Sequence, residues 1–489
     1  MKTRSDVSRS RRSFLRAGAG AALAPVVPQR GAAAEPGGMR LVAVPGQARL
    51  AGEAHPVTRV WSYDGAIPGP VLRVRQGERL RIVVDNRLPE ATTVHWHGIR
   101  LPIAMDGVPG LSQPPIEPGE RYVYDFVVPD AGTFWYHPHA NSLRQLGQGL
   151  AGALIVDERE PVAMDRDVLW VLGDWRLRRD AQIAADFGNP MEAAMAGRIG
   201  NTVTVNGAVS DTEPIRAGER IRLRLANVAL ARIMALRFEG HHPRVIAVDG
   251  QPCKPYRPAG GRVVLGPAMR IDLMLDAEGD PGKRYRVVDD FYREDAYRLT
   301  DLAYSADPPV RRHPRDEPVS LPANPLPWPD LAHAETIDIV LEGGMHGGMG
   351  GMGRMHMGGM GMGGMCMGGM GRAGAGDFAA WAINGVSMTG DGHAGMAALR
   401  TLARGRTYRL RLGNATPWWH PVHLHGHSFL LLARDGLAVP HRQWADTALI
   451  APHETVEAAF VADNPGDWMI HCHILEHQAS GMMAVLRVA

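Results

Sequence analysis

Apolar and polar residues alternate in short runs along most of this chain, and Gly, Pro, Asn or Asp separate the runs. Residues 79–86 form one such run, and residues 220–227 and 407–414 repeat its pattern. A period of two is typical of β-strands with one buried face. Long stretches with the 3.6-residue period of helices are scarce. The pattern therefore predicts an all-β protein made of consecutive Greek-key β-sandwich domains.

These three runs are copies of one repeat. Each copy has a Gly and an Asn nine residues apart, namely Gly77 and Asn86, Gly218 and Asn227, and Gly405 and Asn414. A chain of 489 residues is long enough for two to four domains, and the repeat favours three. We expect the domains at residues 35–158, 159–310 and 335–489, with a Pro-rich linker at 311–334 before the third.

The copies differ at the positions nine and eleven residues after the Asn. The first copy has His95 and His97 there, the third has His423 and His425, and the middle copy has Leu236 and Phe238. Alternate residues of a strand share a face, so each His-x-His presents both imidazoles on one side. The outer domains therefore carry candidate metal half-sites that the middle domain lacks.

A second correspondence links the outer domains. Gly132 precedes His137 by five residues, and Gly466 precedes His471 by five; each of these His residues starts another His-x-His, ending at His139 and at His473. The simplest geometry is a pseudo-twofold interface at which the first and third domains together present eight imidazoles. The middle domain would then act as a spacer.

Cys472 lies between His471 and His473, so in an extended strand its side chain points to the opposite face. His477 follows it by five residues and Met482 by ten. His420 is an odd three residues from His423 and should also face away from the histidine pairs. A His₂Cys set with a weak axial Met is the blue-copper arrangement used for electron transfer. Isolated core or surface histidines are the plain alternative, but four such dense blocks leave it little room.

The four blocks read HWHG at 95–98, HPHA at 137–140, HPVHLHGH at 420–427 and HCHILEHQASGMM at 471–483. With these motifs the chain resembles the multicopper oxidases over nearly its whole length after residue 35. The resemblance implies three cupredoxin folds and four copper ions. It implies a type 1 copper held by His420, Cys472, His477 and Met482, a type 2 copper held by His95 and His423, and a type 3 pair held by His97, His137, His139, His425, His471 and His473.

The resemblance also implies the reaction. The type 1 site takes electrons singly from a reductant, and the type 2 and type 3 coppers reduce dioxygen to water. Protons for this step need a carboxylate. Asp106, eleven residues after His95, resembles the family's acidic residue, although Asp106-Gly107 could equally be a simple turn. Some bacterial relatives have an acid directly after the last type 1 His; here that residue is Gln478, and Glu476 is the second candidate.

The formal charge of +2 hides an uneven distribution. Residues 1–34 hold seven Lys/Arg and one Asp, and the remaining 46 basic and 50 acidic residues leave a net charge of −4, which gives no reason to expect nucleic-acid binding. Arg11-Arg12 followed by an apolar stretch to Val27 is typical of a twin-arginine signal. The stretch is too short for a membrane anchor. We expect export by the twin-arginine machinery to the periplasm, and a monomer.

Residues 343–372 hold ten methionines, most of the rest being glycine. Thioethers are soft ligands that select Cu(I), whereas a neutral linker would be rich in Gly and Ser. We expect the segment to collect copper for a cuprous oxidase that serves copper tolerance. The alternatives are a laccase-like oxidase of phenols and other aromatic donors, for which the methionines are incidental, and a non-catalytic copper-binding protein. The complete ligand set argues against the last.

Overall fold

The computed structural model describes residues 38–311, 317–345, 379–390, 393 and 395–489. Strands dominate these residues, and the few helices are short. The predicted all-β class, with three cupredoxin-like domains, is confirmed. The predicted export signal and most of the methionine-rich segment lie outside the described residues. No helix in the described part of the chain is long and apolar enough to cross a membrane.

The first domain is a sandwich of two sheets, with strand orders β2-β1-β4-β6 and β3-β8-β7-β5. Its strands are β1 Met39–Ala48, β2 Thr58–Tyr63, β3 Gly69–Arg75, β4 Arg79–Asn86, β5 His95–His97, β6 Arg121–Val127, β7 Gly132–His137 and β8 Gly152–Asp157. A 3₁₀ turn, η1 Ile103–Met105, and the helix α1 Ser142–Gln148 lie in its connections.

The middle domain is the second sandwich, with strand orders β10-β9-β12-β17-β14-β15 and β11-β19-β18-β13-β16. Its strands are β9 Arg166–Trp175, β10 Thr202–Val205, β11 Thr212–Ile215, β12 Arg220–Asn227, β13 Met234–Phe238, β14 Arg244–Val248, β15 Gln251–Tyr256, β16 Arg262–Leu265, β17 Arg270–Asp276, β18 Arg284–Asp289 and β19 Tyr297–Tyr304. It also has the helix α2 Pro190–Ala193 and the 3₁₀ turns η2 Ala259–Gly261 and η3 Arg293–Asp295.

The third domain has main sheets ordered β21-β20-β24-β30-β26-β27, with β28 also paired to β26, and β23-β33-β31-β25-β29, besides the pair β22-β32. Its elements are β20 Glu335–Gly343, β21 Trp381–Ile383, β22 Met388–Thr389, β23 Arg400–Leu402, β24 Thr407–Asn414, β25 His420–Leu424, β26 Phe429–Arg434, β27 Leu437–Ala438, β28 Trp444–Ala445, β29 Thr447–Ile450, β30 Thr455–Val461, β31 Gly466–Cys472, α3 Leu475–Ala479, β32 Ser480–Gly481 and β33 Met483–Val488.

The sequence repeat is visible as equivalent strands. β4, β12 and β24 each pair parallel with the first strand of their domain, and antiparallel with β6, β17 and β30. At the end of each strand, the side-chain amide of the buried Asn86, Asn227 or Asn414 donates to two backbone carbonyls, and its oxygen accepts from the N–H two residues on. This side chain replaces missing backbone partners where the chain leaves the sheet.

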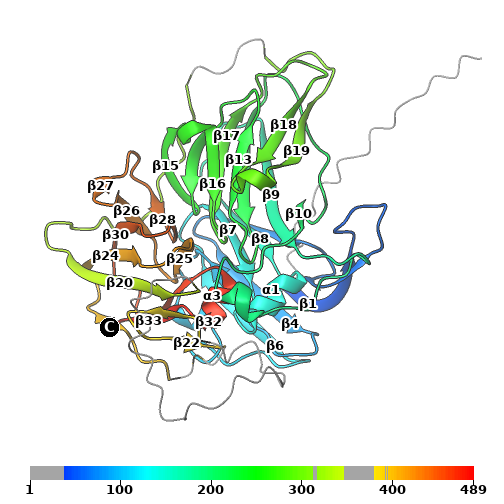
Figure 1. Ribbon diagram of the computed structural model, residues 1–489. Coiled ribbons are helices and arrows are strands. Elements are labelled where there is room, and N and C mark those ends of the chain that lie inside the picture. Colours follow the sequence, from blue (N-terminus) through cyan, green and yellow to red (C-terminus); the bar gives the residue numbers. More distant parts are fainter. Residues whose placement is uncertain (1–37, 312–316, 346–378, 391–392, 394) are drawn as a thin grey trace, which may run out of the picture.

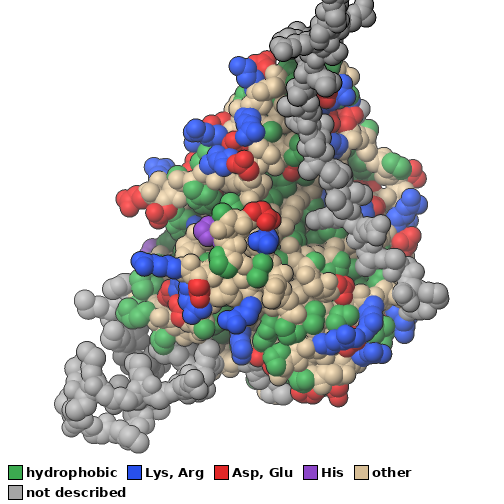
Figure 2. Space-filling view, turned by 90° about the vertical axis from the view of Figure 1, so that its right-hand side faces the viewer, with side chains coloured by type: hydrophobic (Ala, Val, Ile, Leu, Met, Phe, Trp, Pro, Cys, Tyr) green, Lys and Arg blue, Asp and Glu red, His purple; other side chains and the backbone are tan. Residues whose placement is uncertain are grey.

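Figure 1 shows the middle domain above the two outer domains, which lie beside each other. The linker is fastened to the sandwiches: the Asn324 amide donates to Ala131 O, at 2.8 Å, and to Gln251 Oε1, at 2.8 Å. Gly343, the first residue of the methionine-rich segment, is still the last residue of β20. The domain limits to the residue stay a prediction. Basic and acidic side chains are interspersed on the face that Figure 2 shows.

Candidate metal centre

Four strands and the residues directly after them bring eight buried histidines to the meeting face of the outer domains. His95 lies opposite His137 in the β5–β7 pair, and His423 lies opposite His471 in the β25–β31 pair. All eight are at most 2% exposed: His95, His97, His137, His139, His423, His425, His471 and His473. We call this set the histidine cluster.

The contacts within the histidine cluster are reciprocal. The His95 ring stacks on His425 at a centroid distance of 4.0 Å, and its repeat counterpart His423 stacks on His97 at 3.7 Å. The second His-x-His of each outer domain shows the same exchange. The ring centroids of His137 and His473 are 5.2 Å apart, and those of His139 and His471 are 5.4 Å apart. Exchange of equivalent residues across a contact is what a twofold axis produces. The two outer domains therefore meet as the predicted pseudo-twofold pair.

Backbone oxygens orient several of these rings. The Nδ1–H groups of His95, His423, His137 and His471 donate to the carbonyls of Asp106, Asp446, Pro138 and Cys472 at 2.8, 2.9, 3.0 and 2.9 Å. Nε2 of His95, His137 and His423 then has no hydrogen-bond partner within the described residues. An unpaired buried nitrogen is costly, but an imidazole fixed on one side and bare on the other is how a metal-binding histidine is arranged.

The charge state of the rings suits a metal. Burial, and then the neighbouring imidazoles, lower the pKa of His425 to about 3. Burial also lowers the pKa values of His97, His137, His139, His423, His471 and His473. These seven imidazoles are therefore neutral at neutral pH, which is the ligand form. Three histidine triads have nitrogens within 4.8 Å of one another, so the cluster could hold several metal ions.

Two aspartates hold the cluster in matching ways. The Asp106 carbonyl accepts from His95, and Oδ2 of its carboxylate lies 2.8 Å from His425 Nδ1. The Asp446 carbonyl accepts from His423, and Oδ1 of its carboxylate lies 3.2 Å from His97 Nε2. Each aspartate thus binds one histidine of its own domain through the backbone and one of the other domain through the side chain. Asp106 and Asp446 are counterparts under the pseudo-twofold.

The expected Asp106 therefore contacts the cluster, and the turn alternative also applies. Gly107 has φ of +81°, and a Cβ there would lie 2.0 Å from the Val94 carbonyl oxygen, so only glycine fits. Asp446 was missed by the sequence analysis. It lies 23 residues after His423, whereas Asp106 lies 11 after His95. Because these two spacings differ, the sequence repeat does not predict Asp446.

The remaining ligand candidates form a second group, the cysteine site, on the opposite face of β25 and β31. Cys472 Sγ lies 3.5 Å from His420 Nδ1 and 3.6 Å from His477 Nδ1. Met482 is fully buried and is tied in through its backbone, because its N–H donates to His477 O at 2.9 Å and its carbonyl accepts from Cys472 N–H at 3.0 Å. Burial raises the pKa of Cys472, so a bound cation is needed to hold the thiolate. A His₂Cys site of this kind suits copper.

The cysteine site is closed by residues of the third and middle domains. The Trp381 ring lies 4.3 Å from the His477 ring and 5.1 Å from the His420 ring. Its Nε1–H donates to Ala193 O of α2, at 2.6 Å. Just after α2, the Met195 carbonyl accepts from His477 Nε2–H at 2.8 Å. Trp381 thus covers both imidazoles, and a segment of the middle domain contacts Trp381 and His477.

Glu476, the second expected acid, has a different environment. It is buried in α3, and neither of its oxygens has a hydrogen-bond partner among the described residues. Its Oε2 lies 3.3 Å from where a Cβ on Gly197 would stand, so the carboxyl faces the middle domain. Burial raises its pKa to about 7. No hydrogen bond or ion pair joins Glu476 to the histidine cluster in the described part of the chain, whereas Asp106 contacts His95 and His425.

Three cupredoxin-like domains, with a His₂Cys site on one face of a strand and a buried histidine cluster on the other, define a copper-dependent oxidoreductase. Three family models described as "Multicopper oxidase" match residues 47–161, 166–306 and 372–489. The chain belongs to the multicopper oxidase family. It therefore binds copper and couples the oxidation of a reductant to the use of dioxygen.

Individual relatives agree. The crystal structure of a multi-copper oxidase from Pseudomonas thermotolerans is 36% identical, covers 94% of this chain and 100% of its own, and has a TM-score of 0.79. Multicopper oxidase MmcO of Mycobacterium tuberculosis is 29% identical over 87% of this chain and 82% of its own length. Copper resistance protein A of Escherichia coli is 33% identical over 45% of this chain and 43% of its own.

Proposed function

We propose that this protein oxidises Cu(I), with dioxygen as the electron acceptor, and thereby confers copper tolerance. In this proposal a type 1 copper is held by His420, Cys472, His477 and Met482, a type 2 copper by His95 and His423, and a type 3 pair by His97, His137, His139, His425, His471 and His473. The donor chemistry fits four copper ions, because neutral imidazoles line one site and a thiolate with a thioether lines the other.

The observation that carries the choice of Cu(I) is the place where the methionine-rich segment leaves the fold. Met345, the first of its methionines, donates its N–H to Ala194 O at 2.7 Å and accepts at its carbonyl from Trp418 Nε1–H at 3.2 Å. A Cβ on Gly344 would lie 2.4 Å from the Trp381 ring, which touches both histidines of the cysteine site. The segment therefore starts directly above the site that takes electrons.

The protein residues prepare both sites for their chemistry. Bound copper supplies one-electron transfer at the cysteine site and dioxygen reduction at the histidine cluster. Cys472 shares peptide bonds with His471 and His473, so a few covalent bonds connect the two sites. The Asp106 carboxylate, 2.8 Å from His425 Nδ1, is a proton acceptor at the edge of the cluster. Trp381 and Met195 exclude water from the histidines of the cysteine site.

An enzyme that confers copper tolerance should act in the compartment that copper reaches first. The predicted twin-arginine signal supports a periplasmic location, and the name of the E. coli relative, copper resistance protein A, agrees with the role. We propose a monomeric periplasmic enzyme whose substrates are dioxygen and Cu(I).

The test compares Cu(I) and phenol as reductants on one preparation of holoenzyme and on a variant lacking residues 346–372. A second variant keeps the length of that segment but replaces its nine methionines by serine, which separates loss of the thioethers from loss of the segment. Cu(I) turnover at low free copper should fall in both variants, while phenol turnover persists. If Cu(I) turnover is unchanged in both and the phenol is the better reductant, the protein is a laccase-like oxidase instead.

Copper content and colour test the ligand assignment. The holoenzyme should hold four coppers and be blue, and Cys472→Ser should remove the blue absorption while the histidine cluster keeps its metal. Cys253→Ser is the control, because Cys253 is a half-buried free thiol in the middle domain. A wild-type protein that stays colourless and takes up no copper when supplied with it would contradict the proposed oxidase.

A further inference from the structure

The pseudo-twofold that relates Asp106 to Asp446 is broken by one residue of the middle domain. Among the described residues, no lysine or arginine side chain pairs with Asp106. Asp446, in contrast, is bound by Arg270, the first residue of β17, whose Nη1 and Nη2 donate to Oδ1 and Oδ2 at 2.9 and 2.5 Å. The same Oδ1 lies 3.2 Å from His97 Nε2 and 3.3 Å from His423 Nδ1.

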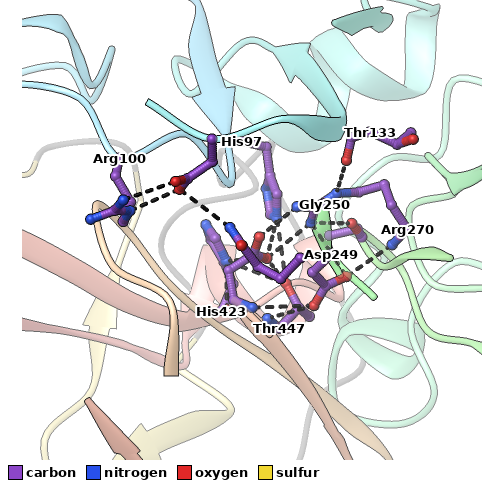
Figure 3. A network of polar contacts seen from close by, with 12 residues as sticks. His97, Arg100, Thr133, Asp249, Gly250, Arg270, His423 and Thr447 are labelled. Carbon is purple, nitrogen blue, oxygen red and sulfur yellow. Dashed lines mark hydrogen bonds and ion pairs between the residues drawn. The ribbon is translucent and has the colours of Figure 1, made fainter. Parts of the chain in front are cut away.

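Arg270 contacts all three domains at once. Its Nε donates to the Thr133 carbonyl of the first domain at 3.2 Å, and its Nη1 donates to Ala268 O of its own domain at 3.1 Å. The side chain is completely buried. Figure 3 shows Arg270 and Asp249, from the middle domain, converging with His97 and His423. Hydrogen bonds to all three domains therefore hold the guanidinium in place, and the guanidinium in turn holds the Asp446 carboxylate.

Asp249 holds the other side of the network. It lies in the β14–β15 turn at φ +49°, and its Oδ1 accepts from the Arg270 backbone N–H at 2.9 Å. Its Oδ2 accepts from the backbone N–H groups of Asp446 and Thr447 at 3.2 and 3.1 Å. The middle domain thus grips the backbone of Asp446 as well as its carboxylate. That backbone includes the carbonyl that orients His423.

A glycine of the first domain leaves room for the ion pair of Arg270 and Asp446. Gly98, directly after His97, has φ +85°, and a Cβ there would lie 2.2 Å from Arg270 Nη2 and 2.5 Å from Asp446 Oδ2. A side chain at residue 98 would push the ion pair away from His97. The sequence HWHG thus supplies both a histidine of the cluster and the space for the residue that positions it.

We infer that Arg270 is a positioning residue for the histidine cluster: it fixes Asp446, which orients one histidine from each outer domain. The middle domain is therefore part of the dioxygen-reducing centre and more than a spacer. This inference rests on the proposed copper cluster. Partners that orient metal-binding histidines are typically worth about tenfold to 100-fold in metal affinity. Arginine is suited to the task because its planar fork grips a carboxylate with two bonds, which lysine cannot do.

The test is Arg270→Met, measured on copper-loaded protein by the ratio of type 2 to type 1 electron paramagnetic resonance signals and by copper bound per chain. The type 2 signal should be lost or altered, with the cluster's copper affinity reduced about tenfold or more, while the blue absorption per chain stays. Arg270→Lys keeps the charge and is more certain to fold; it should retain the type 2 copper with a changed signal.

The matched control is Arg222→Met. Arg222 is also a buried middle-domain arginine, bonded to Asp272 and Glu158 at 2.9 and 2.8 Å, but it does not contact Asp446. It should lower the melting temperature of the copper-free protein as Arg270→Met does, with an unchanged signal ratio. The inference is overturned if both Arg270 variants keep the wild-type ratio and signal, or if Arg222→Met changes them equally. A wild-type protein without any type 2 signal would instead refute the proposed copper cluster.

Discussion

The outer domains and the middle domain use the same strands at the same places but carry different side chains there. Where β5–β7 pairs His95 with His137 and β25–β31 pairs His423 with His471, β13–β18 pairs Leu236 with Asp289. Asp289 serves the fold, because its carboxylate accepts from Ala235 N–H and Tyr297 O–H at 2.9 Å each. The comparison teaches that the repeat specifies a sandwich, and that metal binding was added or lost at a few positions on one pair of strands.

The largest effect should come from replacing His423 of the third domain by leucine, the residue at the equivalent position 236 of the middle domain. His423→Leu removes a proposed ligand whose buried Nε2 has no hydrogen-bond partner among the described residues. Dioxygen-linked turnover should fall roughly 10³-fold or more, as expected when an essential group is lost. The blue absorption of the cysteine site should remain. Turnover within tenfold of wild type would mean that His423 is not a ligand.

The reverse exchange should damage stability without creating a site. Leu236→His buries an imidazole in an apolar position, at a cost of about 2–4 kcal/mol in the free energy of unfolding. Copper per chain should not rise, because β16 and β18, the described strands that pair with β13, carry no histidine. Urea denaturation measures the cost, and Leu236→Met, which keeps the volume, should cost less than about 1.5 kcal/mol. A gain of one copper per chain would contradict the comparison.

A smaller effect should separate two equivalent asparagines. Asn227→Ala removes three hydrogen bonds at a buried strand end and Asn414→Ala removes four, and each variant should cost about 1–3 kcal/mol. Only Asn414 also accepts from the Thr416 hydroxyl, which in turn bonds His420 Nε2 at 2.8 Å. Asn414→Ala should therefore shift the blue absorption band, and Asn227→Ala should leave it in place. Equal spectra for the two variants would mean that the hydrogen bonds of Asn414 do not affect the copper site.

The smallest effect should be the response of the middle domain to copper removal. Ligand binding stabilises the elements that bind it, so loss of copper should speed hydrogen exchange in β5, β7, β25 and β31. Exchange in β13 and β18 should change least, because those strands carry no ligands. Mass-spectrometric exchange of holo and apo protein measures this. Equal acceleration in all six strands would indicate that copper stabilises the three domains as one unit.

Much of this arrangement could be predicted because it is local in the chain. Alternation places His95 and His97 on one face and separates Cys472 from its neighbours, and both follow from strand geometry. Repeat spacing then aligns the two outer half-sites. Arg270, Asp446 and Trp381 could not be found this way, since each acts on a residue far away in sequence. Glu476 shows the opposite failure: it stands beside ligands in sequence, yet its carboxyl faces Gly197.

The pairing of Arg270 with Asp446 also bears on the order of assembly. Two domains supply the imidazoles and the third supplies the guanidinium that orients two of them, so no single domain is competent to bind the full set of ions. A chain whose middle domain has not yet docked lacks the residue that positions two imidazoles of the histidine cluster. Tight metal uptake at the histidine cluster would then report that folding is finished. Copper would enter last, as a final quality check on a chain already built, and partly folded chains would have little capacity to trap it.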